Sequence, residues 1–295
     1  MALAGVLSAI KELVLDAPTL PDSLTDRQAL YADRFSSLSK EEIEDLAKID
    51  PEKLGIYTMT IFKGEKSGLN NHFKMTLGLL KRNWSKLNST PYNEFELVKQ
   101  LHKVRPWKSN KFRDLAENFK IFLLEDQPKY KENIPELSDV LSYETTVMDT
   151  RRFKNAGLEA KDSLQVKALS EMKVPDLLKL HYQVPSYNHF LQFSYDIISA
   201  GIYQKKEKTL IQTFNQGNQF AICSRNIELI TRWTELPEVF WNTLKSNERS
   251  KNYELSELAD LADEIMPDAK NEEELFANFF AYIAKLVERG AVIIT

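Results

Sequence analysis

Apolar residues recur at three- and four-residue intervals through much of the first half of the chain, which is the spacing of one face of an α-helix. The clearest stripe lies in LNNHFKMTLGLLKRNW, and the segments NKFRDLAENFKIFLLED and PELSDVLSYETTVMDTRRF repeat it. Stripes of this width bury against other helices, so residues 1–160 are predicted to form a helical domain. The stripe residues are Leu69, Phe73, Leu77, Leu80 and Trp84, then Phe112, Leu115, Phe119, Phe122 and Leu123, then Leu137, Leu141, Met148 and Phe153.

Capping patterns mark where helices begin in this half. Ser39 lies three residues before Glu42, which is a capping-box spacing. The later stretch DPEKL places an aspartate before a proline, and a proline is well tolerated at the first helical position. Gly64 and Gly68 are predicted to break the helix that follows, because glycine is a poor helix former.

The pattern changes in the second half, where strand signals appear. HFLQFSYDIISAGI is rich in aromatic and β-branched residues and favours a strand. TLIQTFNQGNQFAICSRN then predicts two strands, Leu210–Phe214 and Phe220–Ser224, joined by a turn at NQGN. Three helical segments follow, and the chain ends in AVIIT, which is able to return to the sheet edge. The prediction is a mainly α protein with a small β-sheet, in which residues 161–295 form a winged-helix-like α+β domain.

Composition narrows the classes of function. The formal net charge of −4 and the pI near 5.8 argue against a general nucleic-acid binder, because phosphate contacts need a basic surface. The single cysteine, Cys223, excludes an internal disulfide and a zinc site built on cysteines. No apolar run approaches the roughly 20 residues of a membrane span, and the N-terminal stretch has the spacing of an amphipathic helix. The expected location is the cytoplasm, without a membrane partner.

Residues that carry chemistry are sparse. The sequence has no phosphate-binding loop, nucleophile elbow or zinc-protease motif, and its four histidines are scattered. Glu144 lies within an apolar stripe and needs a partner there, so we expect a structural ion pair with Arg151 or Arg152. Cys223 falls in a predicted strand, where a buried small apolar side chain is the simplest expectation. No catalytic residue and no metal ligand are predicted.

Several segments, taken in order, resemble a family of bacterial proteins described as a "putative DNA-binding domain". YTMTIFKGEKSGLNNHFKMTLGLLKRNW resembles the helix pair that opens those proteins. RPWKSNKFRDLAENFKIFLLED is similar to their proline–serine step and the helix after it, and PELSDVLSYETTVMDTRR to their proline–leucine helix with a central glutamate. QFAICSRN and the segments VFWNTLKSN, LSELADLADEI and YIAKLVERGAV resemble their arginine-bearing strand, three helices and final turn. The similarity spans roughly residues 30–293, and the order of the segments carries it.

The resemblance implies a function for the whole chain. Members of that family are similar to the partner subunits of multinuclear non-haem iron-dependent oxidative enzymes, which modify cysteines in ribosomally made peptides, as in methanobactin and thiaglutamate pathways. It implies a heterodimer in which the partner, a TIM barrel, holds the iron, while this chain carries no cofactor. It further implies that residues 1–160 dock on the enzyme. Residues 161–295 would recognise the leader of a cysteine-containing precursor peptide.

The predicted hairpin suggests where that peptide would bind. An edge strand exposes unpaired N–H and C=O groups, and a peptide can satisfy them as an added strand. Aromatic and aliphatic residues of the hairpin and of LFANFFAYI are then candidates for the walls of a groove, although some of them are expected in the core. The candidates are Phe214, Phe220, Ile222, Phe276, Phe279 and Phe280.

Two other classes of function remain open. A winged-helix-like C-terminal domain is compatible with a DNA-binding transcriptional regulator, but the segment ELSELADLADEIMPDAKNEEEL is acidic and disfavours phosphate contacts there. An independent enzyme is the third class, and the absence of a catalytic motif ranks it last.

Overall fold

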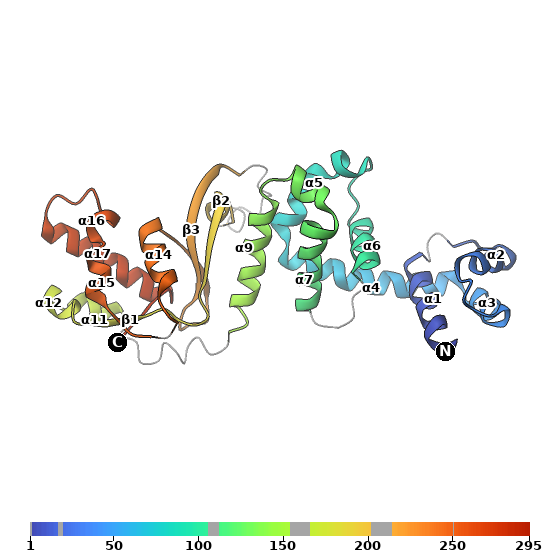
Figure 1. Ribbon diagram of the computed structural model, residues 1–295, viewed down its shortest axis with the longest axis horizontal. Coiled ribbons are helices and arrows are strands. Elements are labelled where there is room, and N and C mark those ends of the chain that lie inside the picture. The colour runs from blue at the N-terminus through green and yellow to red at the C-terminus, as the bar shows by residue number, and fades with distance from the viewer. Residues whose placement is uncertain (1, 17–19, 106–111, 154–165, 202–213, 250) are drawn as a thin grey trace. The chain divides into compact units, whose positions relative to one another are not determined.

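The computed structural model describes residues 2–16, 20–105, 112–153, 166–201, 214–249 and 251–295 (Figure 1). The chain divides into two compact units, Met1–Asn133 and Ile134–Thr295. Helices dominate, and two small three-stranded antiparallel sheets lie in the second unit. This confirms a mainly α protein with a small β component. None of the helices formed by the described residues is both long and apolar enough to cross a bilayer.

Every secondary-structure element formed by the described residues of the first unit is a helix. Its helix starts are fixed locally, as the capping patterns predict. At Ser39 both halves of the capping box form, since the Glu42 N–H donates to the Ser39 hydroxyl and the Ser39 N–H donates to the Glu42 carboxylate. The elements are α1 (Ala2–Asp16), α2 (Leu24–Arg34), α3 (Lys40–Ala47), α4 (Pro51–His72), α5 (Lys74–Asn88), α6 (Glu94–Val104), α7 (Phe112–Ile121), the π-helical turn η2 (Phe122–Asp126) and α8 (Pro128–Asn133).

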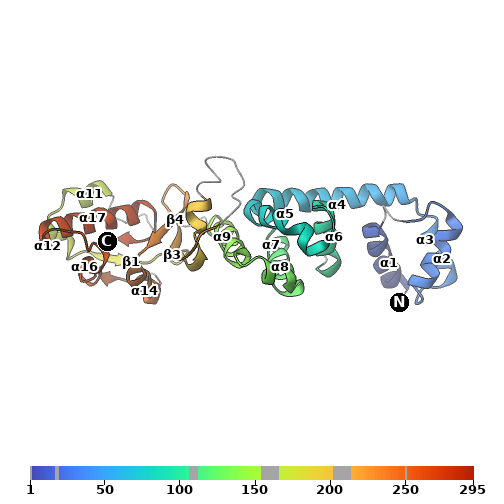
Figure 2. The ribbon, with the colours of Figure 1, turned by 90° about the horizontal axis from the view of Figure 1, so that it is seen from above.

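Helix α4 corrects one prediction, because it continues through Gly64 and Gly68 without a break. Each interior glycine costs roughly 1 kcal/mol relative to alanine. Buried anchors such as Leu54 and Leu69, near the two ends of α4, supply tertiary contacts against that cost. The chain leaves the helix at Phe73 instead, whose side chain is fully buried and whose ring packs edge-on against Phe119. Figure 2 shows α4 as one long, uninterrupted helix.

A cluster of buried apolar residues joins α1, α2, α3 and the start of α4, around fully buried residues such as Leu13 and Tyr31. The stripe residues from α4 to η2 are buried as well, which confirms the helical spacing. Those buried stripe residues are Leu69, Phe73, Leu77, Leu80, Trp84, Leu115, Phe119, Phe122 and Leu123.

The second unit combines strands with helices, in two sheets where one was expected. One sheet has the order β2-β3-β4, and the other has the order β5-β1-β6. The elements are α9 (Leu137–Thr150), α11 (Val166–Glu171), α12 (Val174–Leu177), β1 (His181–Gln183), β2 (His189–Tyr195), β3 (Gln216–Arg225), β4 (Thr231–Leu236), α14 (Glu238–Ser246), β5 (Tyr253–Glu254), α15 (Leu255–Ala259), α16 (Ala262–Ile265), α17 (Glu272–Glu288) and β6 (Ile293–Ile294).

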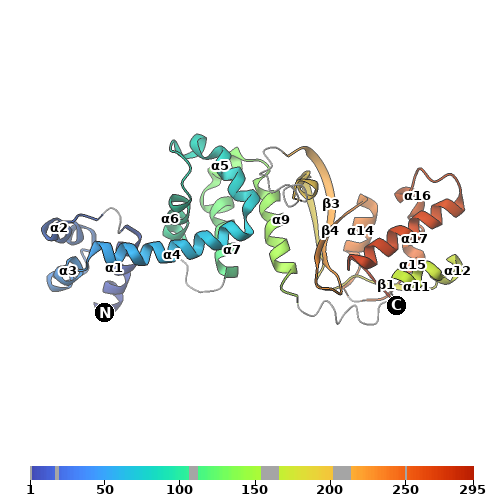
Figure 3. The same cartoon turned by 180° about the vertical axis from the view of Figure 1, so that it is seen from behind.

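The sheet β2-β3-β4 lies between two helical layers (Figures 1 and 3). On one face α9 contributes Tyr143, whose ring stacks on Trp233 at 5.1 Å. On the other face α14 contributes Trp241, whose indole N–H donates to the Ala221 carbonyl at 3.0 Å. Because α9 packs on this sheet, the boundary between the units falls at 133/134 and not at the expected 160.

The predicted hairpin at NQGN is wrong. Gln216, Gly217 and Asn218 continue β3, and β3 pairs with β2 from Tyr195↔Gln216 onward. An irregularity in the β2–β3 register lies between Phe193 and Tyr195, opposite this glycine-containing stretch, and glycine suits such a site. Residues 210–213 of the first predicted strand, Leu210–Phe214, lie outside the described residues. Phe214 is described and does not belong to a strand.

The segment HFLQFSYDIISAGI is only half strand. β2 ends at Tyr195, and residues 197–201 are helical. Two side chains favour this change, since Asp196 accepts the N–H of Ser199 and the buried Gln219 amide accepts the N–H of Ile197 at 3.0 Å. Backbone donors that would face a neighbouring strand are therefore satisfied locally.

The end of α17 requires a glycine. Gly290 has φ +73°, and its N–H donates to Val287 as the helix stops. A Cβ at this position would lie 2.4 Å from the Arg225 carbonyl oxygen at the end of β3. Close packing between α17 and β3 thus depends on the absence of a side chain here.

Candidate peptide-binding surface

Two of the six candidate groove residues lie in the core. Ile222 and Phe279 are 0% exposed and belong to the same apolar cluster. A bound peptide cannot contact either side chain unless the core opens, so we remove both from the candidate surface. Sequence spacing alone does not separate them from their neighbours, because a helix or strand near the surface has apolar residues on its inner and outer sides.

The other four candidates are partly exposed but do not form one groove. Phe214 precedes β3 and is half-buried. The Phe220 ring packs on Trp241 at 5.4 Å, whereas Phe276 and Phe280 stack on each other along α17 at 6.3 Å. Ring contacts among the described residues do not join these two sets.

The position of β3 changes where a strand can be added. β3 is the central strand, and from Phe220 to Arg225 it pairs with both neighbours or with β4. An added peptide needs an unpaired edge, which this stretch lacks. The edges of the sheet are instead β2 and β4.

The edge of β4 is partly occupied by the end of α17. The Arg289 guanidinium donates to the Trp233 carbonyl at 3.2 Å and to the Thr234 hydroxyl at 3.4 Å. An arginine that satisfies an edge carbonyl reduces what this strand can offer to a peptide.

The edge of β2 is occupied at one end only. At its C-terminal end the Ser194 N–H donates to the Asp139 carboxylate at 2.6 Å, and burial raises the pKa of that carboxyl group. From His189 to Gln192 the residues are half-buried or exposed, and within the described part of the chain their only strand partner is β3. This half of β2 is the part of the edge that is open to an added strand, and the Phe153 ring packs on its first residue, His189, at 6.2 Å.

Beside it lies a group of aromatic and basic side chains that sequence spacing did not reveal. Trp241 packs against Phe190 at 6.1 Å and against Phe220 at 5.4 Å. Lys245 lies over the Trp241 ring at 4.2 Å, and Arg249 lies over the Phe190 ring at 4.5 Å. The Trp241–Lys245 pair has i, i+4 helical spacing, which is the one signal of this group visible in the sequence.

The predicted ion pair is supported only in part. Glu144 is 6% exposed, so its burial on α9 is as expected. Arg152 contacts Asp149 at 3.2 Å, and both Arg151 and Arg152 are exposed. The pairing of Glu144 with either arginine stays a prediction.

Cys223 is a buried thiol, as expected. Its sulfur lies 3.3 Å from the Thr150 hydroxyl, and burial raises its pKa to about 12. The register of the sheet places His189 of β2 opposite Cys223 of β3. The sequence does not reveal this pair, because 33 residues separate the two positions. Burial lowers the pKa of His189 and holds Cys223 protonated, so the pair does not generate a thiolate nucleophile.

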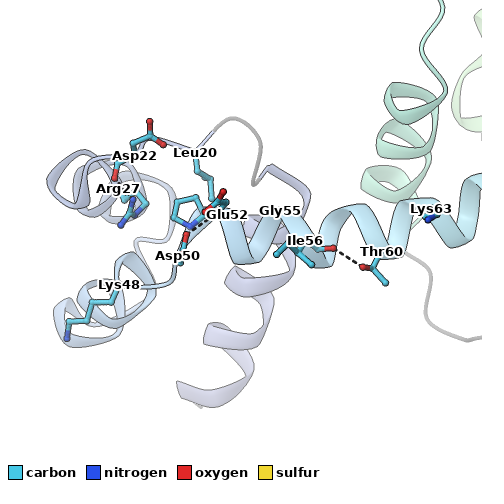
Figure 4. A pocket seen from close by; sticks show the side chains of 11 residues that line it. Leu20, Asp22, Arg27, Lys48, Asp50, Glu52, Gly55, Ile56, Thr60 and Lys63 are labelled. Carbon is cyan, nitrogen blue, oxygen red and sulfur yellow. Dashed lines mark hydrogen bonds between the residues drawn. The ribbon is translucent and has the colours of Figure 1, made fainter.

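The first unit has a cavity of about 1110 Å³ where the α1–α2 and α3–α4 connections meet α4 (Figure 4). Arg27 borders it, but this guanidinium is held by the carbonyls of Ala47, Pro21 and Asp22. Arg27 is therefore a structural link between segments, and its donors are directed at the backbone.

No group of three or more potential metal ligands occurs among the described residues. Comparison with protein-family models finds no match, and comparison with curated proteins finds none either.

Proposed function

We propose that this chain is a non-catalytic subunit of a multinuclear iron-dependent oxidative enzyme and binds the leader of a ribosomally made precursor peptide. The partner, a TIM barrel, would hold the iron, and this chain would present the cysteine of the precursor. The proposal rests on the family resemblance of the ordered sequence segments, together with the architecture of the second unit.

The observation that carries the peptide-binding part is the accessible half of β2. A short antiparallel sheet whose β2 edge has no further strand partner among the described residues offers main-chain hydrogen bonds to an extended peptide, while neighbouring side chains select those of the peptide. The helical layers on both faces hold the sheet in place, so the edge is formed before a peptide binds. Most of the conformational entropy lost on binding is therefore that of the peptide.

The heterodimer part assigns docking to the first unit. Its described surface includes Ile56, 65% exposed in the first third of α4, and Val104, 44% exposed at the end of α6. Single exposed aliphatic residues are ordinary, so these positions are starting points for mapping rather than a defined interface.

Co-expression with a TIM-barrel iron enzyme encoded beside this chain tests the proposal. Size-exclusion chromatography with metal analysis should show one-to-one co-elution, with iron present only when the enzyme is present. A precursor peptide should bind the complex, and a version with a scrambled leader serves as the control. Separate elution, or iron in this chain alone, contradicts the proposal.

A further inference from the structure

The aromatic and basic residues beside β2 form a built surface, which we call the cationic platform: Phe190, Phe220, Trp241, Lys245 and Arg249. Three rings are in mutual contact through Trp241, and each cation lies over one ring, at 4.2 Å and 4.5 Å. Trp241 is 4% exposed, and its indole N–H donates to the Ala221 carbonyl. Both features fix the platform to the core. The cations are therefore held in place by stacking on a rigid support.

The charges of the platform are not neutralised within the described residues. Neither Lys245 nor Arg249 has a carboxylate within ion-pair distance there, whereas nearby Lys251 pairs with Glu248 at 3.5 Å. Desolvation lowers the pKa of the Arg249 guanidinium from its ordinary value. Two positive charges over neighbouring rings, in a protein of net charge −4, form a local site for an anionic group.

The platform borders the accessible half of β2. Phe190 belongs to that strand, and its register partner Ile222 is directed into the core on the same face of the sheet. Side chains of a strand added to β2 would alternate between the two faces. Those on the platform face would lie roughly 5 Å from Phe190 or from Gln192, the next residue on that face.

We infer that the chain binds an extended acidic peptide segment as an added strand along His189–Gln192, with carboxylates at alternate positions meeting Arg249 and Lys245. Main-chain hydrogen bonds to β2 would set the register, and the platform would select acidic side chains. The inference rests on the proposed function, and it specifies which edge is used and what composition the peptide has.

A peptide explains the surface better than a nucleic acid does. Stacked cations and aromatic rings also bind single-stranded nucleic acid, but that mode needs a basic groove along several phosphates. The platform offers two cations, beside a strand edge that alternates N–H donors with C=O acceptors. A phosphate backbone offers acceptors only and would leave the edge carbonyls unpaired, whereas a peptide strand pairs with both kinds of group.

Fluorescence anisotropy with defined probes tests the inference on the full chain. The probe is a labelled peptide of about eight residues, the length of an ordinary strand, with glutamate at alternate positions and threonine between them. Two matched peptides replace glutamate with lysine or place proline at the central positions. A labelled oligothymidine is the nucleic-acid probe. The glutamate peptide should bind most tightly, and proline should abolish binding because it removes main-chain donors.

Variants locate the site. Lys245→Gln with Arg249→Gln should weaken the glutamate peptide about five- to twentyfold, the range expected for two partly exposed charge contacts. Lys285→Gln removes an exposed cation from α17 of the same unit and should leave binding unchanged. Circular dichroism checks that all three chains stay folded, since the substituted side chains are exposed.

Three outcomes overturn the inference: equal binding of the lysine peptide, no effect of the double variant, or tighter binding of oligothymidine that the double variant abolishes. None of these bears on co-elution with the iron enzyme. A stable heterodimer with a failed probe experiment would leave the proposed function standing and remove only this site. Binding of the glutamate peptide without formation of a heterodimer would leave this site standing and contradict the proposed function.

Discussion

The two units differ in the sequence separation of the contacts that determine their structure. In the first unit the capping box at Ser39 and the stripe from Leu69 to Trp84 are set within one or two turns. In the second unit β3 is placed by β2 and β4, and Gly290 is placed by contact with Arg225, 65 residues earlier. Substitutions that disturb long-range contacts should therefore cost more than substitutions on a helix surface.

Phe279 gives the largest expected effect. It is fully buried in the core of the second unit, so Phe279→Ala should lower the free energy of unfolding by about 3–5 kcal/mol. Phe276→Ala, three residues earlier on the same helix and half-buried, should cost about 1 kcal/mol. Urea denaturation followed by circular dichroism measures both. Equal losses would mean that Phe276 is also a core residue.

Gly290 comes next. Gly290→Ala adds a Cβ at a positive φ and 2.4 Å from a backbone oxygen, so we expect a loss of about 2 kcal/mol or more. Thermal unfolding of the variant and the parent protein gives the difference. An unchanged stability would show that α17 can shift away from β3 at no cost, which contradicts the close packing described above.

Cys223 predicts a dependence on pH. Its pKa is raised from 9.0 to about 12, so above pH 9 the unfolded chain loses the thiol proton while the folded chain keeps it. The unfolded state then binds fewer protons, and the free energy of unfolding falls as pH rises, by up to about 1.4 kcal/mol per pH unit. Urea titrations between pH 9 and the raised pKa should show this slope, with the lower part of the range the most informative because tyrosines ionise above it.

The matched control is Cys223→Ala, which should lose most of the slope between about pH 9 and 10, below the range where buried tyrosines with raised pKa values add a slope of the same sign. A parent protein whose stability is flat above pH 9 would mean that the thiol ionises freely in the folded state, contrary to its complete burial.

Gly64 gives the smallest effect, with the opposite sign. It lies inside α4, and a Cβ there meets nothing within 4 Å. Gly64→Ala should therefore raise the free energy of unfolding by about 0.5–1 kcal/mol through helix propensity and reduced freedom of the unfolded chain. A loss of stability would show that the added Cβ of residue 64 is not accommodated on this face of α4, contrary to the open space described above.

Sequence patterns predicted the parts of this protein that depend on neighbours within a few residues. The capping box, the helical stripes and the three helical segments after β4, one of which forms the two short helices α15 and α16, all follow from local spacing. The turn predicted at NQGN does not form because pairing with β2 overrides the turn preference of Gly217, and no local pattern contains that pairing. Phe276 and Phe279 look alike in the sequence, and only the packing of α17 separates them.

The candidate site was less predictable than the fold. Of the platform residues, only Phe220 is among the candidates that the sequence suggests. Arg249 and Phe190 are 59 residues apart and meet because β2 and the end of α14 come together in space. Their contact has no signal in a single sequence.

The sheet β5-β1-β6 has a consequence for synthesis of the protein. The central strand β1 pairs through Tyr182 with Tyr253 on one side and with Ile294 on the other. It is therefore synthesised more than a hundred residues before its last partner, β6. Until the ribosome has released residue 294, Tyr182 and the apolar residues around it lack that partner. The nascent second unit therefore exposes strand edges and apolar side chains during translation, and this interval is when a chaperone would be needed most.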